Sequence, residues 1–298
     1  MKGDQEAVYS HCKTFTRIRL KNSLYFDFYS NIIRILFSVR IKAPVYMPQK
    51  RQLREEQIIQ ASISLFAEKG FLGVRMSDIA KNCEISMGTI YSHFAAKEDL
   101  LMACATTIVA RKMTLFRSII ESGIPVMQRI VTSLISSWLI SQHHQDLIEM
   151  VHLSLMPSIW KRAKQEHVSK QIMLHESFFE LAQPLILEML SNEFNNYTHL
   201  DRTERESLAL QFNHGVWGLC VGLNSTAQSG MAAAYSREPE ACSYHLFSTN
   251  VIHFLQGYGW KEKDPQAFFD RCREKATVIL AQDPWFACPE TSEQGTVA

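Results

Sequence analysis

Residues 83–101 read CEISMGTIYSHFAAKEDLL, and this stretch decides the fold of the front of the chain. Ser86 is a residue type that caps helices, because its hydroxyl can accept a hydrogen bond from an amide of the first turn. Ile90 and Phe94 are four residues apart, so they share one face of a helix over 87–94. The opposite face carries small or polar side chains, namely Gly88, Thr89 and Ser92. The pattern predicts a short helix held by two apolar residues, with an outer face that can meet another molecule.

Two further helices are predicted in front of this one. Apolar residues recur at helical spacing from Leu53 to Phe66, and Gly70 suits the left-handed position that ends a helix. A second short helix is expected from Met76 to Cys83. A helix, a tight turn and a short helix with a polar outer face form a helix-turn-helix, whose second helix fits the major groove of DNA.

The segment from Leu53 to Leu101 closely resembles the DNA-binding domain of TetR/AcrR-type transcriptional regulators, in the string LFAEKGFLGVRMSDIAKNCEISMGTIYSHFAAKEDLL. The resemblance implies an all-α protein, with an N-terminal three-helix helix-turn-helix DNA-binding domain and a larger helical ligand-binding and dimerisation domain. It also implies a homodimer on a near-palindromic operator of double-stranded DNA. The residues nearest the bases would be Met87, Gly88, Thr89 and Tyr91. The phosphate contacts would come from Ser86, Ser92, His93 and Lys97.

Three positions depart from the family pattern. Arg75 replaces a threonine that usually opens the second helix, and we expect its charge to hold a phosphate instead. Met87 stands where a lysine or arginine is frequent, which removes a guanine contact. Glu84 occupies a turn position often filled by glycine, and a left-handed conformation there costs about 1 kcal/mol.

Composition supports this interpretation. Only 12 glycines and 9 prolines occur in 298 residues, which favours helices. The net charge of +1 hides a basic front and an acidic back, because residues 1–46 hold 8 Lys and Arg against 3 Asp and Glu, and residues 118–298 hold 13 against 20. A basic front is typical of a protein that binds a polyanion.

Seven cysteines without a C-x-x-C pair indicate reduced thiols and a cytoplasmic protein. The most apolar stretch, residues 24–39, is too short and too charged to span a membrane, so no membrane partner is expected. His143, His144 and His152 lack the acid or cysteine partners of a metal site, and neither a metal nor a cofactor is expected. Enzyme motifs such as G-x-S-x-G and H-E-x-x-H are missing from the sequence.

Four parts are predicted. Residues 1–46 form an N-terminal extension, which is either an upstream stretch outside a native start at Met47 or a basic, apolar arm for DNA or a membrane. The DNA-binding domain covers 47–96, the regulatory and dimerisation domain covers 97–282, and a tail covers 283–298.

A long helix is predicted from Lys97 to Ser122, and it would form a rod of roughly 37 Å that joins the two domains. Later helices are expected over 125–142, 146–155, 158–190, 203–227, 239–255 and 265–281, with a kink at Pro184. Gly218 and Gly222 share one helix face, where a partner helix could pack in a dimer or within the chain.

An apolar ligand pocket is predicted in the second domain, where aromatic residues are frequent. Its candidate lining residues are Trp138, His152, Trp160, His175, Phe179 and Phe212. The predicted function is that of a homodimeric, sequence-specific transcriptional repressor that a small ligand releases from DNA. The alternatives are an architectural DNA-binding protein without an effector, and a helical enzyme or membrane-tethered factor that uses residues 1–46.

Overall fold

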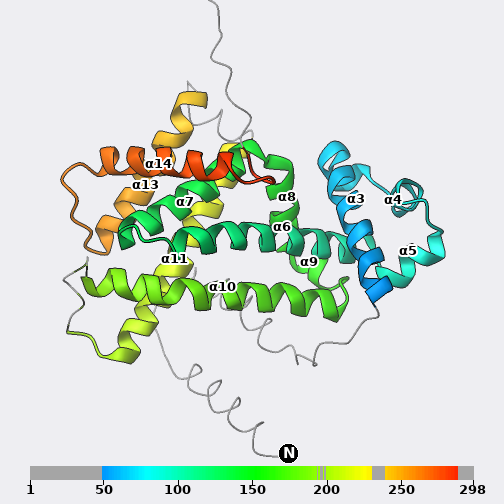
Figure 1. Cartoon of the computed structure of the whole chain (residues 1–298), viewed down its shortest axis with the longest axis horizontal. Helices are drawn as coiled ribbons and strands as arrows, with labels where there is room; N and C mark the ends of the chain where they lie inside the picture. Colours follow the sequence, from blue (N-terminus) through cyan, green and yellow to red (C-terminus); the bar gives the residue numbers. More distant parts are fainter. Residues whose placement is uncertain (1–48, 193, 195–196, 198, 230–238, 288–298) are drawn as a thin grey trace, which may run out of the picture. The chain divides into compact units, whose positions relative to one another are not determined.

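The computed structural model describes residues 49–287, apart from 193, 195–196, 198 and 230–238. All regular elements within these ranges are helices, which confirms the predicted all-α class (Figure 1). The extension over 1–46 and the last residues of the predicted tail, 288–298, lie outside the described residues.

The front of the described chain is a head of three helices, α3 (Gln49–Gly73), α4 (Met76–Asn82) and α5 (Met87–His93). Gly70 interrupts α3 with a φ of 70°, so the helix stops where the glycine predicts it. Five apolar side chains close the centre of the head, each at most 2% exposed: Ile58, Phe66, Ile79, Ile90 and Phe94. Burial of these side chains fixes the angle at which α5 is presented.

Three residues separate the end of α5 from the start of the long helix α6 (Lys97–Ile120). Its first turns are fully buried, with Leu100, Leu101 and Met102 all 0% exposed. α6 packs against α3 of the head and against several helices of the rest of the chain. The predicted 97–122 helix is therefore confirmed to within two residues.

The remaining described helices form the body. They are α7 (Val126–His143), α8 (Gln145–Ser154), α9 (Pro157–Trp160), α10 (Gln165–Asn192), α11 (Arg202–Gln228), α13 (Pro239–Gly257) and α14 (Pro265–Ala281). α10 runs beside α6, α14 covers α7, and α11 packs against both α10 and α13 (Figure 1). The apolar interior between these helices includes Val131, Ile135, Met189 and Phe269, each 0% exposed.

Three expectations for the body are wrong in detail. The single helix expected over 158–190 is two, because the chain turns between α9 and α10. The helix expected over 203–227 begins one residue earlier, because Asp201 and Glu204 cap it, each accepting the other's backbone amide at 2.9 Å. Phe286 is 0% exposed, so the segment from Asp283 packs on the body before the tail begins.

None of the helices over the described ranges combines the length and the hydropathy needed to cross a lipid bilayer.

Candidate nucleic-acid interface

The turn between α4 and α5 sets the position of α5. Glu84 has a φ of 52°, in the left-handed region, and the Ile85 amide donates to the Ala80 carbonyl at 2.9 Å. The Ser86 hydroxyl then accepts the Thr89 amide at 3.0 Å, which caps α5 as predicted. The chain therefore tolerates a strained glutamate in order to start α5 at Met87.

The outer face of α5 is open. Met87 is 42% exposed and Tyr91 is 49% exposed, although both are large side chains. Gly88 and Ser92 are exposed as well, and Thr89 is half-buried. These residues are the predicted base-contacting set together with one predicted phosphate contact, and the structure brings them together on one surface.

Gly88 is not required by packing within this chain. A Cβ atom at this position would meet only the Ser86 hydroxyl, at 3.7 Å, which is an ordinary contact distance. Glycine inside a helix costs roughly 0.8–1.0 kcal/mol relative to alanine. A cost without an internal benefit fits a backbone that approaches an outside molecule closely.

His93 lies elsewhere, and this corrects its predicted role. Its side chain is 7% exposed and turned inward, with Nδ1 at 3.7 Å from a Glu55 carboxylate oxygen. Burial lowers the pKa of His93, although the charge of Glu55 acts in the opposite direction. In this position the ring is not offered to a phosphate.

The other predicted phosphate contacts have distinct placements. The Lys97 ammonium donates to the carbonyls of Phe71 and Val74 at 2.7 and 2.9 Å, so it ties the start of α6 to the link between α3 and α4. Arg75 is exposed at the start of α4, where its amide donates to the Asp78 carboxylate at 2.8 Å. Ser86 is exposed and engaged in the cap.

Sequence reasoning missed a basic group at the start of α3. The Arg51 guanidinium donates to the Ser92 carbonyl at 3.2 Å, so the first turn of α3 meets the last turn of α5. Lys50 and Arg54 are exposed in the same turns. The run QKRQLR at residues 49–54 is the sequence signal for this basic group. Its position beside α5 depends on the packing of α3 against α5, which the local sequence does not indicate.

A buried ionic cluster connects the head to the body. His167 of α10 lies between two carboxylates, with Nδ1 at 2.6 Å from Asp99 of α6 and Nε2 at 3.3 Å from Glu55 of α3. Asp99 is 0% exposed and also accepts the amides of Ala95 at 2.8 Å and Lys164 at 2.7 Å. The Lys164 ammonium donates to the His93 carbonyl, which brings the end of α5 into the same cluster.

The charges in this cluster stabilise one another. Burial alone would lower the pKa of His167, but its hydrogen bonds to Asp99 and Glu55 outweigh burial and raise that pKa. Burial would raise the pKa of Asp99 and of Glu55, but the His167 hydrogen bond and charge lower both. The cluster therefore favours an imidazolium between two carboxylates.

The six residues proposed for a ligand pocket are not brought into one cavity. Trp138 stacks on Phe247 at 4.7 Å between ring centroids, Phe212 packs on Phe254 at 5.4 Å, and the Trp160 indole donates to the Ser154 carbonyl at 2.8 Å. Phe179 is half-buried on α10. Burial lowers the pKa values of His152 and His175, and the nearby charge of Lys112 lowers both further.

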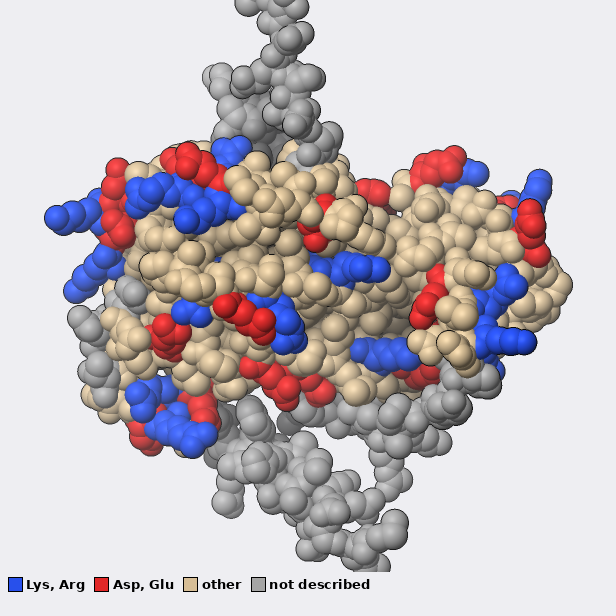
Figure 2. Space-filling model, viewed as in Figure 1, with Lys and Arg blue, Asp and Glu red and all other residues tan. Residues whose placement is uncertain are grey.

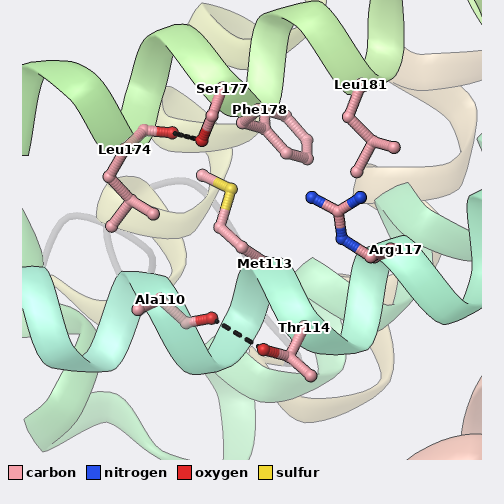
Figure 3. A pocket seen from close by; sticks show the side chains of 8 residues that line it. All are labelled: Ala110, Met113, Thr114, Arg117, Leu174, Ser177, Phe178 and Leu181. Carbon is pink, nitrogen blue, oxygen red and sulfur yellow. Dashed lines mark hydrogen bonds between the residues drawn. The ribbon is translucent and has the colours of Figure 1, made fainter.

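A groove of about 210 Å³ lies between α6 and α10 (Figure 3). Met113, Phe178 and Leu181 give it an apolar lining, and Arg117 lies at its edge. None of the six predicted pocket residues lines this groove. Across the described part of the chain, no group of three or more His, Cys, Asp and Glu side chains is arranged so that it could hold a metal ion.

The head is similar in sequence to known DNA-binding regulators. Residues 58–104 match the model of the family described as bacterial regulatory proteins, tetR family. The regulator YerO of Bacillus subtilis is 40% identical over 68 residues, 23% of this chain and 24% of YerO. The regulator UidR of Escherichia coli K12 is 37% identical over 90 residues, 30% of this chain and 45% of UidR. The similarity to these two relatives thus spans less than half of their length.

A solved structure of a tetR-family regulatory protein from Rhodococcus RHA1 aligns over 70% of this chain and 98% of its own, with 17% identity and a TM-score of 0.45.

Proposed function

We propose that this chain is a homodimeric transcriptional repressor controlled by a small ligand. The proposal starts from residues 58–104, which match the tetR family of bacterial regulatory proteins. The head reads a near-palindromic site in double-stranded DNA, and the body binds the ligand. The observation that carries the DNA-binding part is the exposed face of α5, with its uncovered glycine at position 88.

The contacts divide by chemistry. Met87, Gly88, Thr89 and Tyr91 face the base edges, where a major groove admits one helix. Exposed basic and hydroxyl groups around them suit phosphates: Lys50, Arg51, Arg54, Arg75, Ser86 and Ser92. Figure 2 shows Lys and Arg interspersed with Asp and Glu over the visible face. This face therefore offers no broad basic field, and affinity would come from positioned contacts near α5.

Glycines on α11 support a dimer. A Cβ at Gly215 would lie 2.9 Å from the Phe254 ring, so Gly215 is where α13 approaches α11 within the chain. Gly218 and Gly222 have no atom within 4 Å of such a Cβ. Leu246 of α13 is 46% exposed. A second copy could pack its helices closely against this open face, and a two-fold axis would place two α5 helices about 34 Å apart.

Control by a ligand follows from the connection between α6 and the head. α6 has no break between Lys97 and Ile120, and the cluster around His167 fixes its first turn to α3 and α10. A ligand that separates α6 from α10 would therefore change the angle of the head. Two heads displaced on one dimer would no longer match two half-sites, and repression would be lifted.

The test begins with genome-wide mapping of bound DNA, followed by fluorescence anisotropy with the recovered fragment. Thr89→Ala and Tyr91→Ala are expected to weaken binding by about 1–3 kcal/mol each while leaving thermal unfolding unchanged. Ser77→Ala, on the exposed face of α4, serves as the control. The logarithm of affinity should fall steeply with the logarithm of salt concentration.

An architectural role without an effector would give a different outcome. Binding would then be equal for the recovered fragment and for scrambled DNA, and no small molecule would change it. That pair of results would reject the repressor proposal.

A further inference from the structure

Lys164 lies in the short link between α9 and α10, and it makes contacts in two directions. Its backbone carbonyl accepts the amides of His167 and Val168 at 3.0 and 3.1 Å, so α10 starts from this residue. Its side-chain ammonium donates to the carbonyl of His93, the last residue of α5. A single residue of the body therefore joins the start of α10 to the end of α5.

Cations suit this end of α5. The last carbonyls of a helix have no partner within the helix and carry partial negative charge. The Arg51 guanidinium donates to the Ser92 carbonyl at 3.2 Å, and Lys164 donates to the next carbonyl, that of His93. Arg51 belongs to the head, as α5 does, whereas Lys164 belongs to the body. The Lys164 hydrogen bond thus runs directly from the body to the backbone of α5.

The surroundings of Lys164 fix the place from which its side chain starts. Its amide donates to the Asp99 carboxylate at 2.7 Å, and Asp99 is 0% exposed. Phe94, which directly follows α5, stacks on the His167 ring with 5.3 Å between the ring centroids. The backbone of Lys164 is therefore tied to the first turn of α6, and the first turn of α10 is packed against the end of α5.

We propose that Lys164 is a positioning residue for DNA recognition, which sets the angle of α5 from the start of α10 and does not itself contact DNA. This inference rests on the proposed function and assigns it a coupling residue. A shift of α10 would move the ammonium and, with it, the end of α5, by a route that does not pass along the length of α6. Because α5 has only seven residues, or about 10 Å, a displacement of one end changes the position of its whole outer face.

The test measures DNA binding of full-chain variants by fluorescence anisotropy, with the fragment recovered by genome-wide mapping and with scrambled DNA. Lys164→Met should lose about 10-fold in affinity for the fragment and little for scrambled DNA, because α5 loses a hydrogen bond from a charged donor. Lys164→Arg keeps a cationic donor and should restore most of that affinity. Lys161→Met removes an exposed lysine of the same link and serves as the control, with no loss expected.

Salt dependence separates positioning from a direct phosphate contact. Removal of a lysine that meets a phosphate lowers the slope of log affinity against log salt by about 0.9. The slope for Lys164→Met on the fragment should instead equal that of the wild type. A lower slope, an equal loss on scrambled DNA, a loss that persists in Lys164→Arg, or no loss at all would overturn the positioning role.

A measurement on the wild type keeps the test decisive if Lys164→Met unfolds. Binding of the fragment to α5 should slow hydrogen exchange at the amides of His167 and Val168, because both donate to the Lys164 carbonyl. Unchanged exchange at these amides with the fragment bound would overturn the positioning role and leave the repressor proposal standing. A wild type that does not distinguish the fragment from scrambled DNA would reject the repressor proposal itself.

Discussion

His167 Nδ1 lies 2.6 Å from Asp99 Oδ1, and this contact joins the first turn of α10 to the first turn of α6. Asp99 also accepts the Lys164 amide at 2.7 Å, so a side chain of α6 caps the helix that packs along it. The two helices that would enclose the ligand are thus locked at the end nearest the head. The Lys164 ammonium donates to the His93 carbonyl and so extends this set of hydrogen bonds to the end of α5.

Loss of the Asp99 charge should be costly. Asp99→Asn leaves His167 buried with one fewer counter-charge, and breaking a buried pair typically costs about 3–5 kcal/mol. Glu121→Gln removes an exposed pair with Arg117, 3.4 Å apart, and should change stability by less than about 0.5 kcal/mol. Urea unfolding of both variants measures the difference. Equal effects would show that the buried cluster does not hold the helices together.

Stability should depend on pH through His167. Its pKa is raised in the folded chain above the ordinary 6.5, so its contribution is complete below about pH 6.5 and is lost as pH rises through the folded pKa. Asp99 and Glu55 have lowered pKa values, and their contribution is lost only as pH falls below about 4. His93, whose pKa is lowered, acts against His167 near neutrality.

Comparing the wild type with His167→Gln isolates the contribution of His167 to the pH dependence of stability. The difference in the free energy of unfolding should shrink as pH rises above the ordinary imidazole value of 6.5 and through the raised pKa of folded His167. A difference that stays constant over that rise would mean that the His167 pKa is not raised in the folded protein.

Local patterns predicted the head well, and contacts from distant residues explain the misses. The break in α3 and the start of α5 follow from short-range signals, namely the glycine at position 70 and the Ser86 cap. The start of α10 could not be read in the same way, because its cap is Asp99, which is 65 residues away in sequence. His93 was expected at the surface because its partner, Glu55, lies on a helix whose orientation toward α5 is not encoded locally.

The ligand site was predicted poorly for a related reason. Aromatic side chains were taken as pocket lining, yet Trp138 and Phe212 pack on rings of α13 and belong to the core.

Glu84→Gly should stabilise the head. A non-glycine residue in the left-handed region, such as Glu84, costs about 1–2 kcal/mol, and glycine removes this cost. Because glycine also increases the entropy of the unfolded chain, part of that gain is lost, and a net stabilisation of about 1 kcal/mol is expected. Glu68→Gly, within the helical part of α3, should instead lose about 1 kcal/mol. Thermal unfolding of the two variants compares them directly, and destabilisation by Glu84→Gly would contradict the strained turn.

Two glycines of α11 should respond oppositely to substitution. Gly222→Leu adds bulk where the chain leaves open space, so the monomer should fold normally. The dissociation constant of the dimer should rise, because the added side chain would clash with the second copy. Gly215→Ala forces a Cβ to within 2.9 Å of Phe254 and should lower the melting temperature. Sedimentation and thermal unfolding separate these effects. An unchanged dimer in Gly222→Leu would place the dimer interface on another face.

The central claim is that the outer face of α5 lies against DNA bases. A photocrosslinking amino acid at position 91, where Tyr91 is 49% exposed, tests it with DNA recovered by genome-wide mapping. The same label at Ser77 on α4 gives the comparison. Position 91 is expected to crosslink to bases within the bound site, and position 77 is expected to crosslink far less. Crosslinks at position 77 alone, or at neither position with DNA bound, would contradict it.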